Sequence, residues 1–148
     1  MLQLAPDLFT VALPLPFLGL AFGIRTTILV LPDASLWVHS PIPLTPDLRA
    51  AVDLLGPVRH LVAPNLFHHR WVGEWAQAFP DALVHGPAAL ARKRRDLTLH
   101  RELGSPEPDW GDALVPLSMH GMGRQQETHF LHPASRTLIS ADLVLALP

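Results

Sequence analysis

Polar side chains that could carry out chemistry follow three apolar segments, each with the composition of a β-strand. In open α/β sheets, reactive groups lie just beyond the carboxyl ends of the strands. If the three strands are parallel neighbours or reach the same edge, these groups converge. They are Asn65, His68 and His69 after a strand ending at Ala63, His120 after one ending at Ser118, and Asp142 after one ending at Ala141.

Neutral imidazoles and a carboxylate suit Zn²⁺, Fe or Mn²⁺, and an open coordination position on such a metal activates water. We therefore expect a metal site made by His68, His69, His120 and Asp142. Asp142 is also the expected catalytic residue. A carboxylate surrounded by hydrocarbon requires a cation, a metal or hydrogen-bond donors, and Asp142 lies between apolar residues.

Each histidine also has a structural interpretation. Adjacent side chains on a helix point about 100° apart, so His68 and His69 both face one metal only if the segment is still a loop. The pair can equally be structural or exposed to solvent. His120, in the segment MHGMG, can equally be an ordinary loop histidine.

Several other chemistries lack their sequence patterns. The chain has no cysteine, which excludes disulfides, thiolate nucleophiles and sulfur ligands. It has no Gly-x-Ser-x-Gly, Gly-x-Gly-x-x-Gly or P-loop motif, so we expect neither Ser-His-Asp hydrolysis nor nucleotide binding. The remaining histidines have no shared spacing, and we expect them at the surface or in local hydrogen bonds. They are His39, His60, His85, His100, His129 and His132, of which His129 has Glu127 two residues away on the same strand face.

These candidates require an α/β arrangement with a mainly parallel central portion. We expect strands at residues 8–15, 26–31, 35–39, 58–63, 82–85, 113–118, 128–131 and 137–141, and helices at about 46–55, 69–78 and 88–94. The first helix is defined by Thr45 as N-cap, proline at its first position and Gly56-Pro57 at its end. Alternating strands and helices with short connections imply right-handed crossovers.

Composition and charge limit the class of partner. At 148 residues, the chain suits one domain covering residues 1–148. Hydrophobic residues make up 49%, charged residues 16%, and the mean hydropathy is +0.25, so we expect a compact fold with apolar surface left over. A net charge of −2 gives no general attraction to nucleic acid or membranes. The basic run RKRR at residues 92–95 is expected to complement a helix dipole, the alternative being a phosphate or partner contact.

The apolar run at residues 9–24 does not predict membrane insertion. Pro14 and Pro16 interrupt it, no Lys or Arg precedes it, and it is shorter than the about 20 residues of a spanning helix. We expect a cytoplasmic protein, which agrees with the lack of cysteine. The apolar surface predicts a homodimer or another partner contact.

Five segments of the chain carry a family resemblance. They are, in order, SLWVHSPIPL, TPDLRAAVDLLGPV, RHLVAPNLFHHRWVGEW, FPDALVHGP and HPASRTLISADLVLAL. Together they resemble the DUF4336 family, regarded as a divergent branch of the metallo-β-lactamase-like fold. The resemblance extends over nearly the whole chain, and PNLFHH combined with SRTLISADL is its most specific part. It implies an αββα sandwich, with a mixed β-sheet flanked by helices and a metal-activated water at one edge.

The resemblance implies that the first metal motif is damaged. The superfamily motif His-x-His-x-Asp-His corresponds to the segment that begins at Asn65. This correspondence places Asn65 and Phe67 at the first two histidines, His69 at the aspartate and Arg70 at the last histidine. A shift of one residue instead places His68 at the aspartate and His69 at the last histidine. In neither case is the ligand set complete.

The later superfamily ligands have closer counterparts. His120 in MHGMGRQQ corresponds to a histidine in a Gly-rich turn, and Asp142 in TLISADL to the bridging aspartate. The last superfamily histidine has no counterpart before Pro148, so we expect either a shortened member that covers its exposed face by association, or an incomplete chain. The resulting expectation is a degenerate metal site with a binding role towards a partner or a small ligand. The alternative is a metal-dependent hydrolase that activates water on a His/Asp-bound Zn, Fe or Mn; nucleic-acid binding through RKRR ranks third.

Overall fold

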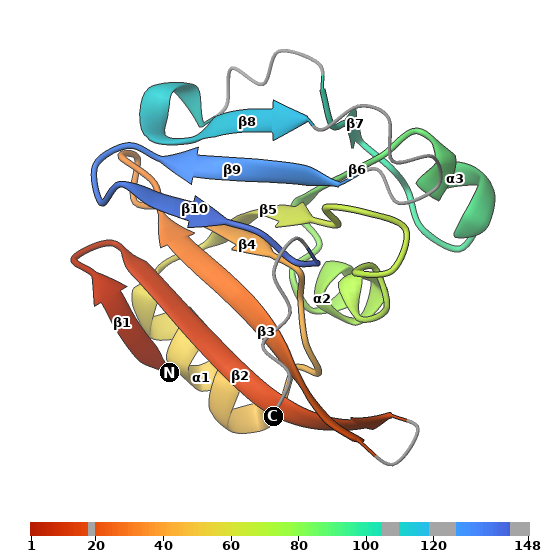
Figure 1. Cartoon of the computed structure of the whole chain (residues 1–148), viewed down its shortest axis with the longest axis horizontal. Helices are drawn as coiled ribbons and strands as arrows, with labels where there is room; N and C mark the ends of the chain where they lie inside the picture. Colours follow the sequence, from red (N-terminus) through yellow and green to blue (C-terminus); the bar gives the residue numbers. More distant parts are fainter. Residues whose placement is uncertain (18–19, 105–109, 119–126, 143–148) are drawn as a thin grey trace.

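Two β-sheets packed face to face form the centre of the molecule (Figure 1). The computed structural model describes residues 1–17, 20–104, 110–118 and 127–142 of the chain. Three α-helices pack on the side of the larger sheet that faces away from the smaller one: α1 (Pro46–Leu55), α2 (Val72–Ala78) and α3 (Ala89–Lys93). The described residues therefore form the helix, sheet and sheet layers of the expected sandwich.

The larger sheet has seven strands that lie in the order of the sequence. They are β1 (Leu2–Ala5), β2 (Leu8–Phe17), β3 (Leu20–Val30), β4 (Leu36–His39), β5 (Val58–Val62), β6 (Leu83–Gly86) and β7 (Arg101–Glu102). Strands β1 to β4 pair antiparallel, and β4 to β7 pair parallel. The helices α1 and α2 connect parallel neighbours, as the alternating pattern predicts. Because parallel strands end at one edge, β4, β5 and β6 present their carboxyl ends together.

The smaller sheet is an antiparallel meander of three strands. A short 3-10 helix, η1 (Gly111–Ala113), precedes β8 (Val115–Ser118), which pairs with β9 (Thr128–His132). The third strand, β10 (Thr137–Ile139), pairs with the other side of β9. In Figure 1 these strands cross in front of the larger sheet, with α1 and α2 behind it.

Strand β4 is buried on both faces and contributes to two hydrophobic cores. Leu36 and Val38 pack towards the helices, whereas Trp37 packs between the sheets. The ring of Trp37 lies edge-on to Trp110 and Phe130, with centroids 6.1 and 4.9 Å away. Successive side chains of a strand point to opposite faces, so a strand between two cores is apolar throughout.

Local sequence signals set the boundaries of α1. Thr45 accepts a hydrogen bond through its side chain from the N–H of Leu48, and Pro46 occupies the first turn. Gly56 ends the helix with φ +151°, and a Cβ at that position would lie 2.5 Å from the carbonyl oxygen of Ala34. Glycine is therefore required there by both conformation and space.

Some elements differ from the sequence prediction. The run at residues 9–24 belongs to the long β2–β3 hairpin, in which the strands extend beyond the predicted residues 8–15 and 26–31. Pro14 is tolerated because β1 pairs with β2 only up to Thr10, so β2 is an edge strand at Pro14. The strands β1 and β7 were not predicted, and α2 begins at Val72. Within the described ranges, no helix has the length and apolar character needed to cross a membrane.

Candidate functional site at the strand ends

The loop between β5 and α2 carries the first predicted ligands, and Asn65 determines its shape. Asn65 is buried, and its Oδ1 accepts hydrogen bonds from the backbone N–H groups of Phe67 and His68, both at 2.8 Å. An asparagine that bonds to the backbone just ahead of it stabilises a turn. His68 and His69 therefore belong to a loop, because α2 begins at Val72.

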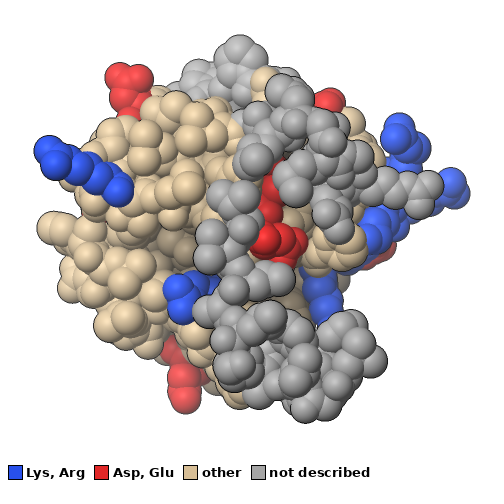
Figure 2. Space-filling model, in the orientation of Figure 1, with Lys and Arg blue, Asp and Glu red and all other residues tan. Residues whose placement is uncertain are grey.

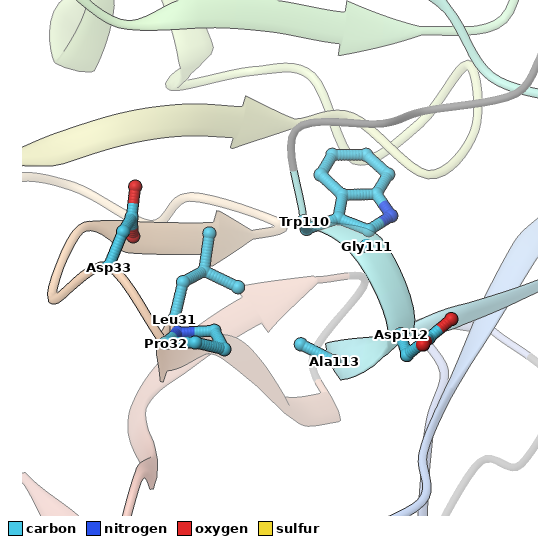
Figure 3. A pocket seen from close by; sticks show the side chains of 7 residues that line it. All are labelled: Leu31, Pro32, Asp33, Trp110, Gly111, Asp112 and Ala113. Atoms are coloured by element: carbon cyan, nitrogen blue, oxygen red, sulfur yellow. The ribbon is translucent and has the colours of Figure 1, made fainter.

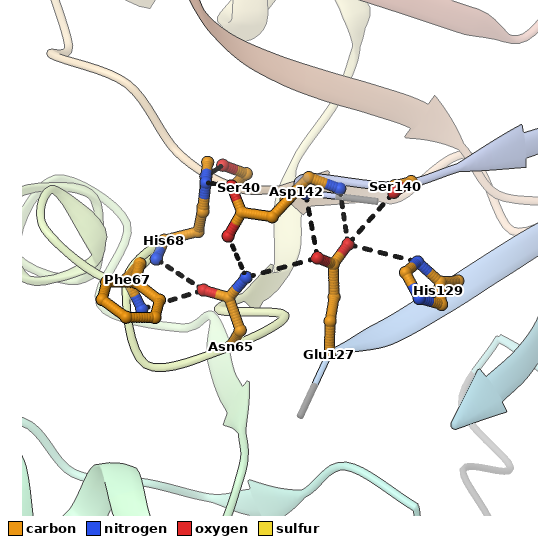
Figure 4. Close-up of polar contacts among 9 residues, drawn as sticks. Ser40, Asn65, Phe67, His68, Glu127, His129, Ser140 and Asp142 are labelled. Atoms are coloured by element: carbon orange, nitrogen blue, oxygen red, sulfur yellow. Dashed lines mark hydrogen bonds and ion pairs between the residues drawn. The ribbon is translucent and has the colours of Figure 1, made fainter. Parts of the chain in front are cut away.

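His68 lies between a carboxylate and a hydroxyl group (Figure 4). Its Nε2 is 2.9 Å from Oδ1 of Asp142, and its Nδ1 is 2.5 Å from Oγ of Ser40. Asn65 donates a hydrogen bond from Nδ2 to Oδ2 of Asp142 at 2.8 Å. The structure thus brings three of the predicted residues together, Asn65, His68 and Asp142, and adds Ser40, which the sequence analysis did not select.

The carboxyl group of Asp142 is held in its ionised form. The hydrogen bond from His68 is the largest cause that lowers its pKa, and the hydrogen bond from Asn65 also lowers it, while partial burial acts in the opposite direction. The side chain of Asp142 is 42% exposed and that of His68 is 23% exposed, so solvent reaches the pair. An ionised carboxylate only accepts hydrogen bonds, which fixes the direction of its contacts.

Glu127, directly before β9, fixes the segment that carries Asp142. Its buried carboxylate accepts hydrogen bonds from the backbone N–H groups of Ala141 and Asp142, at 2.6 and 2.9 Å, and from the Ser140 hydroxyl at 3.3 Å. Nδ1 of His129 lies 3.2 Å from Oε1 of Glu127, as their spacing on one strand face predicts, although outside hydrogen-bond geometry. Glu127 is therefore a structural anchor that holds Asp142 towards His68.

His69 points to a different set of partners from those of His68. Arg94 donates to both Nδ1 and the backbone oxygen of His69, at 3.1 and 3.0 Å. Burial, followed by the cations Lys93 and Arg94, lowers the pKa of His69. The remaining predicted ligand, His120, lies outside the described residues.

The basic run at residues 92–95 fixes the loop that carries the site. Arg92 and Lys93 lie in the last turn of α3, where they complement the helix dipole as predicted. Lys93 also donates to the backbone oxygen of Leu66 at 2.5 Å, and Arg94 forms an ion pair with Asp96 at 2.6 Å. Figure 2 shows Lys and Arg mainly at the margins of this face of the molecule.

Five of the remaining histidines are buried, so the surface position, one of the two predicted alternatives, is wrong for them. They are His39, His60, His85, His129 and His132. The other alternative, a local hydrogen bond, is present for His132, whose Nδ1 lies 2.7 Å from Oγ of Ser135. His39 stacks on Trp37 with ring centroids 5.5 Å apart, and Nδ1 of His60 lies 3.0 Å from Nε2 of His85. Burial is the main cause that lowers the pKa values of His39 and His85 to about 3. The rings of His39, His60 and His85 pack against the aromatic side chains between the sheets, at positions set by strand alternation and not by their spacing in the sequence.

A hollow of about 310 Å³ lies at the opposite end of β4 from Ser40 (Figure 3). Its lining comes from the β3–β4 turn and from residues 110–113, and includes Asp33 and Asp112. Asp33 accepts hydrogen bonds from the backbone N–H and hydroxyl of Ser35, at 3.0 and 2.7 Å, and these bonds lower its pKa. Asp33 thus stabilises the turn. The described residues that line this hollow include none of the predicted site residues.

Two solved structures with a similar architecture are metallo-β-lactamases. The crystal structure of metallo-beta-lactamase IND-7 superposes with a TM-score of 0.64 at 14% identity, covering 90% of this chain and 65% of that one. The metallo-beta-lactamase from Pontibacter korlensis gives a TM-score of 0.62 at 13% identity, covering 92% and 67%. This chain therefore spans less than two thirds of the first structure. The fold is that of a metallo-β-lactamase-like protein, as the sequence resemblance implies.

The family is defined by a second comparison. The model of the family described as "Domain of unknown function (DUF4336)" matches residues 9–89, more than half of the chain. The chain therefore belongs to the DUF4336 family. Comparison with curated proteins finds no match.

The residues of the centre do not fit the metal that the fold implies. Two tetrahedral ligands about 2.0–2.2 Å from Zn²⁺ lie roughly 3.3 Å apart, whereas Nε2 of His68 and Oδ1 of Asp142 are at the 2.9 Å of a charge-assisted hydrogen bond. Asn65 uses its oxygen and its nitrogen in hydrogen bonds, and Nδ1 of His69 contacts a guanidinium cation. In the described part of the chain, no three His, Asp or Glu side chains are grouped so as to hold a metal ion.

Proposed function

We propose that this protein is a metallo-β-lactamase-like domain in which a hydrogen-bonded centre has replaced the metal centre, and that it binds a small polar ligand there. The observation that carries this proposal is the direct hydrogen bond between His68 and Asp142, completed by Asn65. The side chains of Asn65, His68 and Asp142 satisfy one another's hydrogen bonds. The protein then has no need of a cation to neutralise Asp142.

The ligand would bind to the exposed side of the His68–Asp142 pair. Asp142 presents an ionised carboxylate that is 42% exposed, and acidic side chains are visible near the middle of the face in Figure 2. A hydrogen-bond donor on the ligand suits this carboxylate. The buried anchor Glu127 and the turn at Asn65 keep the pair in place before binding, which lowers the entropic cost of recognition.

Elemental mass spectrometry of the purified protein tests this proposal. We expect less than about 0.1 equivalent of Zn, Fe and Mn, and we expect the same value for His68→Ala and Asp142→Ala. A ligand that binds only the folded state raises the melting temperature, so a chelator lowers that temperature only when it removes a bound metal. We expect a chelator to leave the melting temperature unchanged. A near-stoichiometric metal that is lost in both variants would overturn the proposal.

The second candidate is a metal-dependent hydrolase. It is supported by the meeting of His68 and Asp142 at a solvent-accessible strand edge, where such enzymes place a metal. In that case His68 and Asp142, with His120, would hold Zn, Fe or Mn. Added Zn²⁺ or Mn²⁺ would then raise the melting temperature of the parent protein and not that of Asp142→Ala.

A further inference from the structure

Ser40 occupies a position from which a side chain can react. It directly follows β4, next to the carboxyl end of the parallel strand β5, and its backbone N–H donates to the oxygen of Val62 at 2.9 Å. Its φ is +52°, in the left-handed region that residues other than glycine rarely adopt. Such conformations in a non-glycine residue occur preferentially at functional sites. The backbone bond to β5 holds Ser40 against His68.

The hydrogen-bond directions in the chain Asp142–His68–Ser40 follow from the contacts of Asp142, whose Oδ2 accepts from the side-chain amide of Asn65 at 2.8 Å. The carboxylate can only accept, so Nε2 of His68 carries a hydrogen and donates it to Oδ1. In the neutral ring, Nδ1 then has the free lone pair. Ser40 therefore donates its hydroxyl hydrogen to Nδ1 at 2.5 Å. A base beside a hydroxyl and a third group that orients the base form the arrangement of an activated nucleophile.

We propose that Ser40 is a nucleophile, with His68 as its general base and Asp142 as the residue that orients His68. This inference rests on the proposed metal-free centre, because it requires Nε2 of His68 to donate to Asp142 and not to bind a metal. The ring nitrogens are exchanged relative to the usual Ser-His-Asp triad, in which Nε2 faces the serine. The proton path is equivalent, since either nitrogen of imidazole can act as the base.

The reaction with an acyl compound would proceed in two balanced steps. Oγ of Ser40 attacks the carbonyl carbon, its proton passes to Nδ1 of His68, and the leaving group departs with that proton, which leaves an ester on Ser40. Water then attacks the ester, gives its proton to Nδ1 and releases the carboxylic acid as Ser40 regains its hydrogen. Asp142 stabilises the imidazolium that exists during each step.

The backbone around Ser40 indicates the class of substrate. The N–H of Ser40 is bonded to Val62, and the next residue, Pro41, has no N–H, so neither amide can stabilise an oxyanion. Attack on ordinary esters and amides then lacks its usual stabilisation. Compounds with a good leaving group, such as acyl thioesters and aryl esters, suit this centre. Ser40 is 4% exposed, so the acyl group would approach past His68 and Asp142, which are more exposed.

Covalent labelling with a fluorophosphonate tests the proposal. The reagent transfers its phosphonyl group to a nucleophilic serine, with fluoride as leaving group and the serine proton passing to the base. The whole protein is incubated with the reagent in the presence of EDTA, and the adduct is located by intact-mass and peptide mass spectrometry. We expect one adduct, on Ser40. An unlabelled protein, or an adduct at another serine, would overturn the proposal.

Variants separate a reactive serine from a structural one. Ser40→Gly removes the hydroxyl and suits φ +52°, and it should abolish labelling with a melting temperature close to that of the parent. His68→Gln should slow labelling about 100-fold, the usual contribution of a general base. Ser135→Ala removes a hydroxyl of the β9–β10 turn that contacts His132 and Thr137 outside the centre, and it should label at the parental rate. Equal labelling rates for His68→Gln and the parent would refute the role of His68.

The metal content of the same sample distinguishes the two proposals. If the protein contains no metal and remains unlabelled, the nucleophile proposal fails and the metal-free centre stands. If the protein as purified contains stoichiometric metal that depends on His68, the metal-free centre fails. The nucleophile proposal then fails as well, because Nε2 of His68 would bind the metal and not donate to Asp142.

Discussion

Replacement of Asn65 by alanine removes the residue on which the geometry of the site most depends. Asn65 connects the loop after β5 with the segment after β10. It accepts two bonds from backbone N–H groups and donates to Asp142 and, at 3.4 Å, to Glu127. Alanine satisfies none of these groups. We expect the loop to lose its turn and His68 to lose its fixed position beside Asp142.

The expected loss of stability is about 3 kcal/mol. Each backbone N–H without its partner costs about 1 kcal/mol, since water reaches part of this loop. The charge-assisted bond to the half-buried Asp142 adds about 1 kcal/mol after allowance for solvent. The loss of about 3 kcal/mol is a minimum. Asn65 is 2% exposed, so removal of its side chain also leaves a small cavity.

Urea denaturation of the parent protein and of Asn65→Ala measures the difference in their free energies of unfolding. The comparison requires that this free energy depends on urea concentration with a similar slope in both proteins. Gln3→Ala is the matched control, because Gln3 is an exposed amide with one hydrogen bond, to the oxygen of Pro6 at 3.0 Å. It should cost less than about 0.5 kcal/mol. If Asn65→Ala were no more costly than Gln3→Ala, the proposed role of Asn65 would be wrong.

Two further predictions concern the inter-sheet histidines and the outer face of the smaller sheet. The pKa of His39 is lowered to about 3, so between pH 6.5 and 3 the unfolded chain binds a proton that the folded chain does not. As the pH falls through this range, His39 should therefore lower the free energy of unfolding by about 1.4 kcal/mol per pH unit. His39→Phe should reduce that slope in urea titrations between pH 6.5 and 4, and an unchanged slope would contradict the assignment. Leu138, 49% exposed, and Val115, 41% exposed, both pair with Leu131 in one row, so we expect a homodimer through this face. Leu138→Lys should shift sedimentation to the monomer, whereas a parent protein that sediments as a monomer would exclude the dimer.

Much of the fold could be predicted because its signals are local. Thr45, Pro46 and Gly56 specify both ends of α1, and the alternation of strands and helices specifies the parallel strands β4 to β6. The burial of His39 could not be predicted, since it depends on the smaller sheet, whose residues lie about 90 positions further along the chain. Histidine is a polar residue, and the residues next to His39 in the sequence do not show which face of β4 another sheet covers.

The candidate site was predicted in part by the rule that reactive groups follow strands. That rule selected Asn65, His68 and Asp142, which contact one another. Applied to β4, the rule also selects Ser40, but Ser40 lies outside any Gly-x-Ser-x-Gly pattern and its sequence neighbours give no sign of reactivity. The rule did not select Glu127, because Glu127 precedes a strand and does not follow one. It precedes β9, an antiparallel strand whose amino end lies at the edge where the parallel strands end.

The protonation of the His68 ring tests the metal-free centre most directly. A long-range ¹H–¹⁵N correlation spectrum of the folded protein distinguishes the two ring nitrogens, and His68→Gln assigns the signals. We predict hydrogen on Nε2, bonded to Asp142, and the same spectrum with Zn²⁺ or with EDTA. A ring with hydrogen on Nδ1, whose Nε2 signal shifts when Zn²⁺ is added, would contradict the account.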